Sequence, residues 1–291
     1  MQVAPKVRLI AIPEDNHIMR LTSTNVYLIG EKDALLIDSG LGEEASNKLI
    51  FDALEAVSAK LAWIVITHVH KDHFGGAGAL KEATGARIAV HAANAAALEK
   101  ESDSLKVDIL LDHRSQFHVD GVKVEVINTP GHSPGDLCLF VQESGILFTG
   151  DTILGTGTVM VDGDMVQYME SLHRLLDYEA RIICPGHGPV VPDARKKIRE
   201  IIDHRNKREE QIVALLTFSN RTPWELVQAI YIDVDAKLHK AAEHNVKGHL
   251  LKLIQEGRVR KGDEAPAVEP EQPATESEKE KEPVFIYELI R

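Results

Sequence analysis

The sequence has 291 residues, which is enough for one large domain or two ordinary ones around a substantial core. Hydrophobic residues make up 44% of it and charged residues 27%, a balance that excludes a disordered or fibrous chain. No apolar run approaches the roughly 20 residues that a membrane-spanning helix needs, so we expect no membrane partner. The first residues show no secretion signal and the chain has only two cysteines, so we expect a cytoplasmic protein.

The first two thirds of the chain alternate short apolar segments with helical patterns. Strands are expected at residues 7–12, 26–29, 34–38, 63–67, 87–90, 122–127, 137–141, 146–150 and 181–184. Helices are expected at residues 43–58, 76–83, 92–100 and 166–177. An Asp-Gly pair at residues 120–121 predicts a hairpin turn, while strand–helix–strand units occur elsewhere. The mixture predicts an αββα sandwich of the α+β class, with two sheets and helices outside them, and not a doubly wound parallel sheet.

The last third of the chain is mainly helical. Apolar residues recur at three- and four-residue steps after residue 192, Thr222 and Pro223 begin a second helix, and residues 235–256 form a third. Residues 258–261 and 284–290 then resemble the two strands of a hairpin. Three helices followed by a hairpin predict a winged-helix domain over residues 193–291, after a first domain over residues 1–192.

Residues 262–283 lie between the two strands of this hairpin and are rich in Glu, Pro, Ala and Lys. Such a composition cannot bury enough apolar surface to become ordered, so we expect a disordered acidic wing loop. The alternative is a disordered tail, with residues 284–290 packing elsewhere in the protein.

The net charge of −12 is unevenly distributed along the chain. Residues 1–194 carry 15 basic and 27 acidic side chains, whereas residues 195–261 carry 15 basic and 9 acidic ones. Residues 262–291 carry 3 basic and 9 acidic side chains. A basic segment inside an acidic protein indicates a surface that could attract an anionic partner.

One strand-to-loop corner concentrates metal-binding residue types. The stretch THVHKDHFGG, residues 67–76, places three histidines and an aspartate within seven positions after the expected strand at 63–67. A polar turn over a buried strand would instead need Gly, Asn or Pro. Three further fragments follow other expected strands: TPGHSPGD with His132, FTGD with Asp151 and CPGHG with His187. Strand ends can meet at one edge of a sandwich, so these side chains predict one shared site.

These motifs, in this order, resemble those of the metallo-β-lactamase-fold hydrolases over roughly residues 7–190. The resemblance implies that His68, His70 and His132 hold one metal ion. It implies that Asp72, His73 and His187 hold a second, with Asp151 between the two. Asp38 in LLIDSG matches an aspartate that supports the site from outside the ligand set, and Asp72 also matches the catalytic residue that orients the nucleophile.

The residue types indicate which metal and which reaction to expect. Imidazole and carboxylate ligands without a thiolate favour two Zn²⁺ ions, with iron or manganese as alternatives. Two such ions about 3.5–4 Å apart can share a water and lower its pKa from about 15.7 toward 7. The resulting bridging hydroxide would attack a carbonyl carbon or a phosphorus, so we expect a hydrolase. His17 is a further candidate for the pocket wall.

The C-terminal third bears on the substrate. HRNKREEQI, TPWELVQAIY, VKGHLLKLIQEGRV and the closing IYEL resemble the winged-helix region of the beta-lactamase-like protein 2 subfamily. That resemblance implies an endoribonuclease acting on single-stranded RNA. The cationic candidates for phosphate contacts are Arg205, Lys207, Arg208, Lys237, Lys240 and Lys247.

A second class of substrate fits the same metal motifs. Hydroxyacylglutathione hydrolases (glyoxalase II) and acyl-carrier-protein thioesterases cleave small thioesters with the same ligands. The low aromatic content, 5%, and the negative total charge weigh against tight RNA binding through base stacking. Both classes therefore stay open, and the exposed helix faces permit a homodimer.

Overall fold

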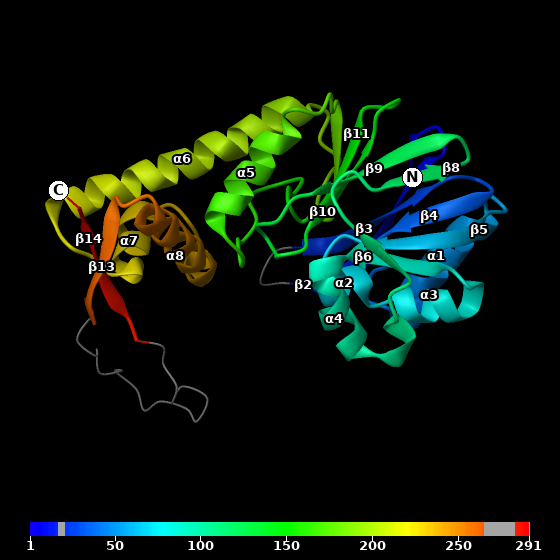
Figure 1. Cartoon of the computed structure of the whole chain (residues 1–291), viewed down its shortest axis with the longest axis horizontal. Coiled ribbons are helices and arrows are strands. Elements are labelled where there is room, and N and C mark those ends of the chain that lie inside the picture. The colour runs from blue at the N-terminus through cyan, green and yellow to red at the C-terminus, as the bar shows by residue number, and fades with distance from the viewer. Residues whose placement is uncertain (17–20, 265–282, 291) are drawn as a thin grey trace. The chain divides into compact units, whose positions relative to one another are not determined.

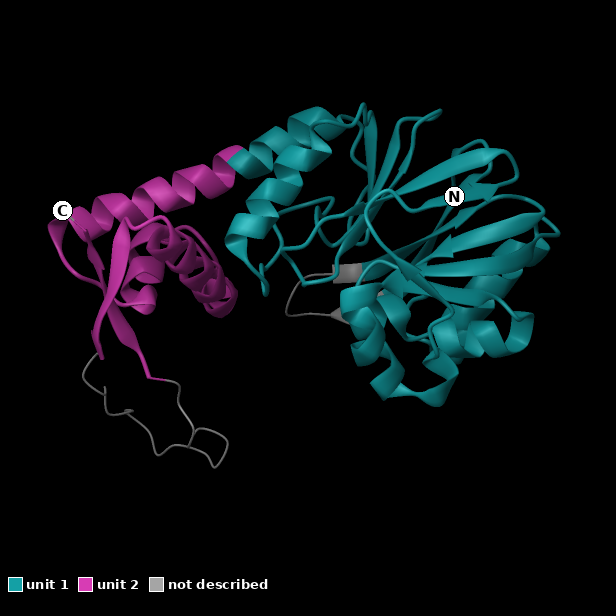
Figure 2. Cartoon of the chain, in the orientation of Figure 1, with its two compact units in different colours: residues 1–202 teal, residues 203–291 magenta. Residues whose placement is uncertain are grey.

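The computed structural model describes residues 1–16, 21–264 and 283–290 (Figure 1). His17 and most of the expected acidic wing loop lie outside the described residues. The chain divides into two compact units, Met1–Ile202 and Asp203–Arg291, which we call unit 1 and unit 2 (Figure 2). The expected domain boundary after residue 192 lies just before a long helix, and the two units divide inside that helix.

Unit 1 begins with a mixed sheet whose seven strands pair in the order in which they occur in the chain. Neighbouring strands are antiparallel from the first to the fourth and parallel from the fourth to the seventh. The strands are β1 (Gln2–Ala4), β2 (Val7–Asn16), β3 (Leu21–Ile29), β4 (Asp33–Ile37), β5 (Lys60–Ile66), β6 (Arg87–His91) and β7 (Ile109–Leu111). The helical segments in this part of the chain are α1 (Glu44–Glu55), α2 (Lys71–Phe74), α3 (Ala77–Thr84), α4 (Ala92–Glu101) and η1 (Asp103–Leu105).

A second sheet completes the sandwich, with its five strands in the order β12-β11-β10-β9-β8. These strands are β8 (Gln116–Val119), β9 (Val122–Asn128), β10 (Leu137–Val141), β11 (Ile146–Gly150) and β12 (Ile182–Pro185). The expected turn joins β8 to β9, with Asp120 at φ 50° and Gly121 at φ 81°, the positive angles that such a two-residue hairpin requires. Helix α5 (Met165–Leu175) connects the parallel strands β11 and β12.

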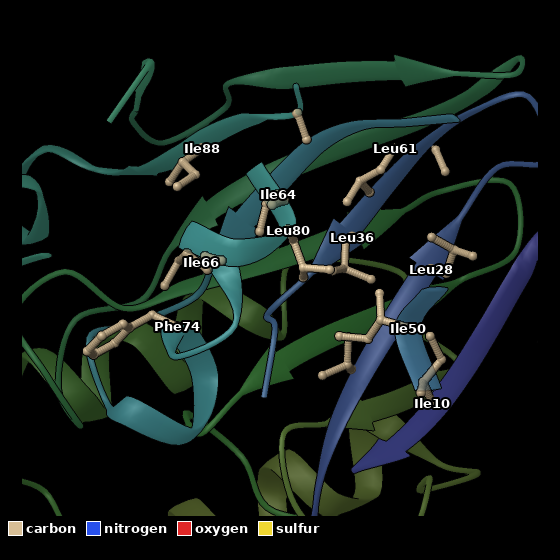
Figure 3. Close-up of a cluster of buried hydrophobic side chains, with 14 of the residues drawn as sticks. Ile10, Leu28, Leu36, Ile50, Leu61, Ile64, Ile66, Phe74, Leu80 and Ile88 are labelled. Carbon is tan, nitrogen blue, oxygen red and sulfur yellow. The ribbon is translucent and has the colours of Figure 1, made fainter. Parts of the chain in front are cut away.

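Alternation along the strands places the two sheets between helices. Leu28 and Leu36 face the first helical layer, where they belong to a cluster with Ile50 of α1 and Leu80 of α3 (Figure 3). Residues one position away on the same strands, such as Tyr27, face the second sheet instead. A third cluster packs the outer face of the second sheet against α5 and the start of the next helix. The αββα sandwich predicted from the sequence is therefore confirmed.

Unit 2 has the three helices and hairpin of a winged helix. Its elements are the later part of α6 (Ala194–Phe218), α7 (Pro223–Ile230), the short turn η2 (Ala236–Leu238), α8 (His239–Gln255), β13 (Val259–Glu264) and β14 (Phe285–Leu289). Thr222 caps α7 through a reciprocal capping box with Glu225, and Pro223 occupies the first helical turn. Val227, Val246 and Leu250 are among the residues that form the core of this unit. The winged-helix prediction is confirmed.

Three strands of unit 1 are absent from the sequence prediction. They are β1, β7 and β8, which have only three or four residues each. Segments this short give little alternation to detect, and β7 exposes its central residue. In the part of the chain that the structure describes, no helix combines the length and the apolar character needed to cross a membrane.

Candidate metal centre

All seven expected ligand residues lie in one region of unit 1, in the segments that follow the ends of strands. They form two groups in which the candidate ligand atoms lie within 4.8 Å of one another. The first group is His68, His70, His132 and Asp151, and the second is Asp72, His73 and His187. Side chains from α2 and from the segments that follow β5, β9, β11 and β12 therefore converge, although 119 positions separate the first candidate ligand from the last.

In the first group, the ring nitrogens of three histidines face one another. His70 Nδ1 lies 2.9 Å from His68 Nε2 and 3.1 Å from His132 Nε2. Asp151 Oδ2 lies 4.0 Å from His68 Nε2. His68 and His132 are buried, and His70 is partly exposed, so one side of this group is open to solvent. Three imidazole nitrogens and a carboxylate oxygen thus surround one small volume.

The second group has a similar arrangement with fewer nitrogens. Asp72 Oδ2 lies 3.1 Å from His187 Nε2 and 3.3 Å from His73 Nε2, and the two histidine nitrogens are 3.2 Å apart. Asp151 also reaches this group, because its Oδ1 lies 3.5 Å from His73 Nε2 and its Oδ2 lies 3.5 Å from His187 Nε2. Asp151 is therefore the side chain that lies beside both groups.

The opposite nitrogen of the buried rings is held by an oxygen outside the two groups. The pairs are His73 Nδ1 with Asp38 Oδ2 at 2.7 Å, His132 Nδ1 with the Met160 carbonyl at 2.8 Å, His187 Nδ1 with the Ser23 carbonyl at 2.9 Å, and His68 Nδ1 with Thr67 Oγ1 at 3.0 Å. A ring that donates through Nδ1 presents an unprotonated Nε2 to the centre. Several lone pairs about 3 Å apart repel unless a cation lies among them, so this donor set fits a metal ion.

Asp38 occupies the supporting position that the resemblance implies. Its carboxylate is buried and accepts hydrogen bonds from Thr67 N at 2.8 Å and Thr67 Oγ1 at 2.9 Å, as well as from His73. The residue has a left-handed backbone, with φ 61°, which aspartate tolerates better than most residues. Asp38 therefore fixes both the ring of His73 and the first residue of the loop that carries His68.

The loop that carries His187 leaves room for this centre only because residue 186 is glycine. A Cβ atom on Gly186 would lie 2.5 Å from Asp151 Oδ1 and 2.8 Å from His73 Cε1. Asp151 Oδ1 is buried and has no hydrogen-bond partner among the described residues. A buried carboxylate oxygen in that position costs free energy unless a cation or a donor satisfies it, which again fits a metal ion.

The charges of the site also suit metal binding. Burial, followed by the neighbouring histidines, lowers the pKa of His68 well below its usual value, so its ring is a neutral ligand at pH 7. Burial alone would raise the pKa of Asp72, but hydrogen bonds with His187 and His73 hold that pKa far below the usual range. Asp72 is therefore an anionic carboxylate. Burial would lower the pKa values of His73 and His187, but the neighbouring carboxylates raise both overall, so a bound cation would take the place of a proton at these rings.

Strand β3 contributes three residues that the sequence analysis does not single out. Thr24 Oγ1 donates to Asp72 Oδ2 at 3.3 Å, and the Ser23 carbonyl holds His187. The buried Asn25 amide donates to the carbonyls of Pro185 and Gly188 at 3.0 and 2.8 Å, which fixes the loop around His187. None of these residue types is a typical metal ligand, so the sequence carried no signal for them.

The cationic candidates in unit 2 do not share one environment. Arg205 is buried, with 1% of its surface exposed, and the Arg208 guanidinium lies 4.4 Å from the ring centroid of Tyr231. The other four candidates, Lys207, Lys237, Lys240 and Lys247, are exposed. Two of the six side chains therefore have structural roles, and the four lysines are exposed cations.

Comparison with known families covers both units. Residues 19–187 match the metallo-beta-lactamase superfamily, and residues 222–266 match the beta-lactamase associated winged helix domain. Among solved structures, a metallo-beta-lactamase family protein from Thermus thermophilus is 25% identical, with a TM-score of 0.72 over 90% of this chain and 97% of that one. A beta-lactamase domain protein from Burkholderia ambifaria has a TM-score of 0.77 over 90% of this chain and 89% of its own, at 21% identity, which supports the fold.

Three curated relatives have sequences similar to most of this chain. The Beta-lactamase-like protein 2 homolog of Drosophila melanogaster is 34% identical over 83% of this chain and 86% of its own length. The Caenorhabditis elegans homolog is also 34% identical, over 82% of this chain and 81% of its own. An atrochrysone carboxyl ACP thioesterase from Aspergillus fumigatus is 33% identical over 73% of this chain and 70% of its own.

Proposed function

This chain belongs to the metallo-beta-lactamase superfamily and is a metal-dependent hydrolase, and from that premise we propose that it binds two zinc ions and cleaves phosphodiester bonds of single-stranded RNA. The observation that carries the two-ion part is the position of Asp151, whose carboxylate lies beside both groups of ligand atoms. Each group alone offers at least two imidazole nitrogens and a carboxylate, a donor set that suits zinc, with iron or manganese as alternatives.

Two divalent ions in such a site supply a water of lowered pKa and stabilise the negative charge that develops on the reacting oxygens. The residues of this chain hold and orient the reacting groups. Asp72 Oδ2 lies at the partly exposed side of the second group, where it can accept a proton from the attacking water. Thr24 Oγ1 donates to that same oxygen, which fixes the carboxylate for the proton transfer. Asp72 is therefore the proposed catalytic residue.

The proposal of RNA as the substrate rests on the resemblance of both units to the beta-lactamase-like protein 2 subfamily. The two Beta-lactamase-like protein 2 homologs cover more than four fifths of this chain, so the likeness includes the winged helix as well as the metal site. Unit 2 exposes Lys207, Lys237, Lys240 and Lys247, which could contact phosphates of a single strand. An unpaired strand can bend to present one phosphodiester at a metal centre, whereas a rigid duplex presents its phosphates only along its own surface.

Thioester hydrolysis is the second candidate. The Aspergillus fumigatus relative is named an ACP thioesterase and is nearly as similar to this chain as the animal homologs. Attack on a thioester carbonyl needs the same activated water and the same stabilisation of a developing oxyanion. The ligand residues alone therefore do not separate the two substrates.

The test compares zinc-loaded protein with an Asp72→Ala, His73→Ala variant on labelled single-stranded RNA and on two thioesters, S-lactoylglutathione and an acyl-carrier-protein thioester. We expect metal-dependent cleavage of the RNA by the wild type alone. Turnover of only a thioester, at ordinary enzyme rates, would overturn the proposed substrate. RNA cleavage that is equal in the variant would show contamination by another nuclease and would also contradict the proposal.

A further inference from the structure

Unit 2 has a pocket of its own, and we propose that it binds one unpaired nucleotide of single-stranded RNA. This inference rests on the proposed function, because it identifies how the winged helix would hold the substrate. The pocket has a volume of about 340 Å³. Its lining residues come from the start of α7, from α8, from the two strands of the hairpin and from the two residues before β14, and they are Pro223, Lys247, Lys261, Pro283, Val284, Phe285 and Tyr287.

The charge of the pocket favours an anionic ligand. Its described lining residues include two lysines and no carboxylate. Lys247 is about half exposed, and its ammonium lies 3.5 Å from Glu243, one turn earlier on α8. An exposed ion pair of this kind contributes little to stability, so a phosphate can replace Glu243 as the partner of Lys247 at small cost. Two ammonium groups and an anionic phosphate are complementary.

The second lysine is held in place by an aromatic ring. Lys261 Nζ lies 3.3 Å from the centroid of Phe285, on the neighbouring strand of the hairpin. A cation–π contact of this kind restricts the long side chain without neutralising its charge. Lys261 therefore offers a positioned cation rather than a freely moving one, as a specific phosphate site requires.

The apolar part of the pocket suits a base. Phe285 is partly exposed and Tyr287 is nearly buried, and they stand beside Val284 and the two prolines. Bases of single strands stack on aromatic side chains, whereas paired bases are stacked on each other and unavailable. One face of the Phe285 ring is taken by Lys261, so a base would use the remaining ring surface together with Pro223 or Val284. The pocket thus combines phosphate and base contacts within the reach of one nucleotide.

The size of the pocket argues against a protein as its occupant. A volume of about 340 Å³ lies near the lower limit of sites that hold small ligands, roughly 300 Å³. A helix of an acyl carrier protein would need a longer apolar groove for its i, i+3 and i+4 side chains. An acidic carrier protein is therefore the rival outcome of the experiment and not the occupant that we propose.

The experiment measures binding of a fluorescently labelled single-stranded oligouridylate to the full chain by anisotropy, with Asp72→Asn in every protein so that the RNA stays intact. There are two pocket variants: the double substitution Lys247→Ala, Lys261→Ala and the single substitution Phe285→Leu. The matched control is Lys237→Ala, Lys240→Ala, which removes two exposed cations of the same unit that do not line the pocket. Urea unfolding of each protein checks that the substitutions leave the winged helix folded.

We expect the pocket lysine pair to weaken RNA binding on the order of tenfold or more and to reduce the slope of log K against log salt by about 1.4, since two phosphate contacts are lost. Phe285→Leu should weaken binding roughly fivefold or more through lost stacking. The control pair should change affinity less than about threefold. Glu243→Gln should tighten binding, because it releases Lys247 for the phosphate.

Equal losses in the pocket pair and the control pair would overturn the inference, because affinity would then follow general surface charge. Absence of RNA binding, or binding of an acyl carrier protein that only the pocket variants lose, would overturn it as well. Failure of the proposed function gives a different result: the RNA binds in the pocket, but the wild type with zinc does not cleave it. If the wild type cleaves RNA and the pocket variants bind normally, only this inference fails.

Discussion

The two units use their polar residues in different ways. In unit 1, seven candidate ligand residues converge from helix α2 and from the segments that follow four strands, and buried oxygens fix the rings, as Asp38 fixes His73 at 2.7 Å. In unit 2, the candidate substrate contacts are mostly lysines on exposed surfaces, and Lys247 pairs with a nearby glutamate, Glu243. Many side chains held in fixed positions can specify one reaction. A few exposed lysines contact a substrate weakly and can adjust their positions, so they select the substrate less strictly.

The largest effect on activity and metal content is expected from substitutions of the candidate ligands in unit 1. Replacing Asp72 and His73 by alanine removes two of the three candidate ligands of the second group. We expect the rate of hydrolysis of any substrate to fall on the order of 10³-fold or more, and the protein to lose about one metal ion per chain. Steady-state kinetics and elemental analysis of purified protein measure the two effects.

The matched control for that variant is Asp52→Ala, His118→Ala, which removes the same two residue types from exposed positions of unit 1. This control should keep full activity and full metal content. If the Asp72→Ala, His73→Ala variant kept full activity and full metal content, unit 1 would not contain the proposed metal centre.

A smaller effect on zinc binding is expected at Asp38, which contacts the candidate ligand His73. Asp38→Asn weakens the hydrogen bond to His73 Nδ1 and can no longer accept from both Thr67 groups and the ring with full negative charge. We expect zinc affinity, measured by competition with a chelating dye, to fall about 10–100-fold. Asp52→Asn, an exposed substitution of the same type, should leave zinc affinity unchanged, and an unchanged affinity in Asp38→Asn would contradict the supporting role.

Unit 2 also contains a buried carboxylate, Glu209, whose contacts test whether its polar groups are held as tightly as those of unit 1. Glu209 accepts from Lys252 at 2.8 Å and from Arg258 at 2.9 Å. Burial would raise the pKa of Glu209, but its contacts with His249 and Lys252 lower that pKa to about 2. Because the folded pKa is depressed, the stabilisation is complete above the unfolded value, about 4.3, and is lost as the pH falls from there toward 2.

We therefore expect Glu209→Gln to reduce the free energy of unfolding of unit 2 by about 2–3 kcal/mol at pH 7. The difference from the wild type should narrow progressively below about pH 4.3. Urea unfolding followed by the fluorescence of Trp224, in a Trp63→Phe background, reports on unit 2. The exposed neighbour substitution Glu210→Gln should have little effect at any pH. A deficit in Glu209→Gln that did not change with pH would contradict the charge assignment.

The smallest effect concerns the start of α7. Thr222 Oγ1 accepts from Glu225 N at 3.3 Å, and Glu225 Oε2 accepts from Thr222 N at 2.7 Å. Thr222→Ala should lower the free energy of unfolding of unit 2 by about 1 kcal/mol, again measured through Trp224. Thr217→Ala, at an exposed position late in α6, should be neutral or slightly stabilising. Equal effects of the two substitutions would show that the capping box is not significant.

The sequence predicted the parts of unit 1 that depend on long, regular patterns and on ligand-type residues. Nine expected strands and the positions of His68 through His187 could be found because apolar strands end directly in histidine- or aspartate-containing loops. Thr24, Asn25 and Gly186 could not be found in that way. Their roles depend on which side chains lie opposite them, and pairing between distant segments has no local sequence pattern.

Unit 2 shows the same limit in another form. The amphipathic spacing and the Thr222–Pro223 start predicted its helices, but spacing did not show which cations are exposed. Arg205 looked like a surface residue because it lies in a strongly basic run, yet it is buried. The cationic lining of the hairpin pocket joins Lys247 and Lys261, which belong to different elements, so only the folded unit shows it.

The central claim is that the seven candidate ligands of unit 1 hold two cations close together. Anomalous diffraction at the zinc absorption edge from crystals of the zinc-loaded protein tests it most directly. We expect two peaks about 3.5–4 Å apart, one among His68, His70 and His132 and the other among Asp72, His73 and His187, with Asp151 contacting both. A single peak, or zinc bound only outside these residues, would contradict the claim.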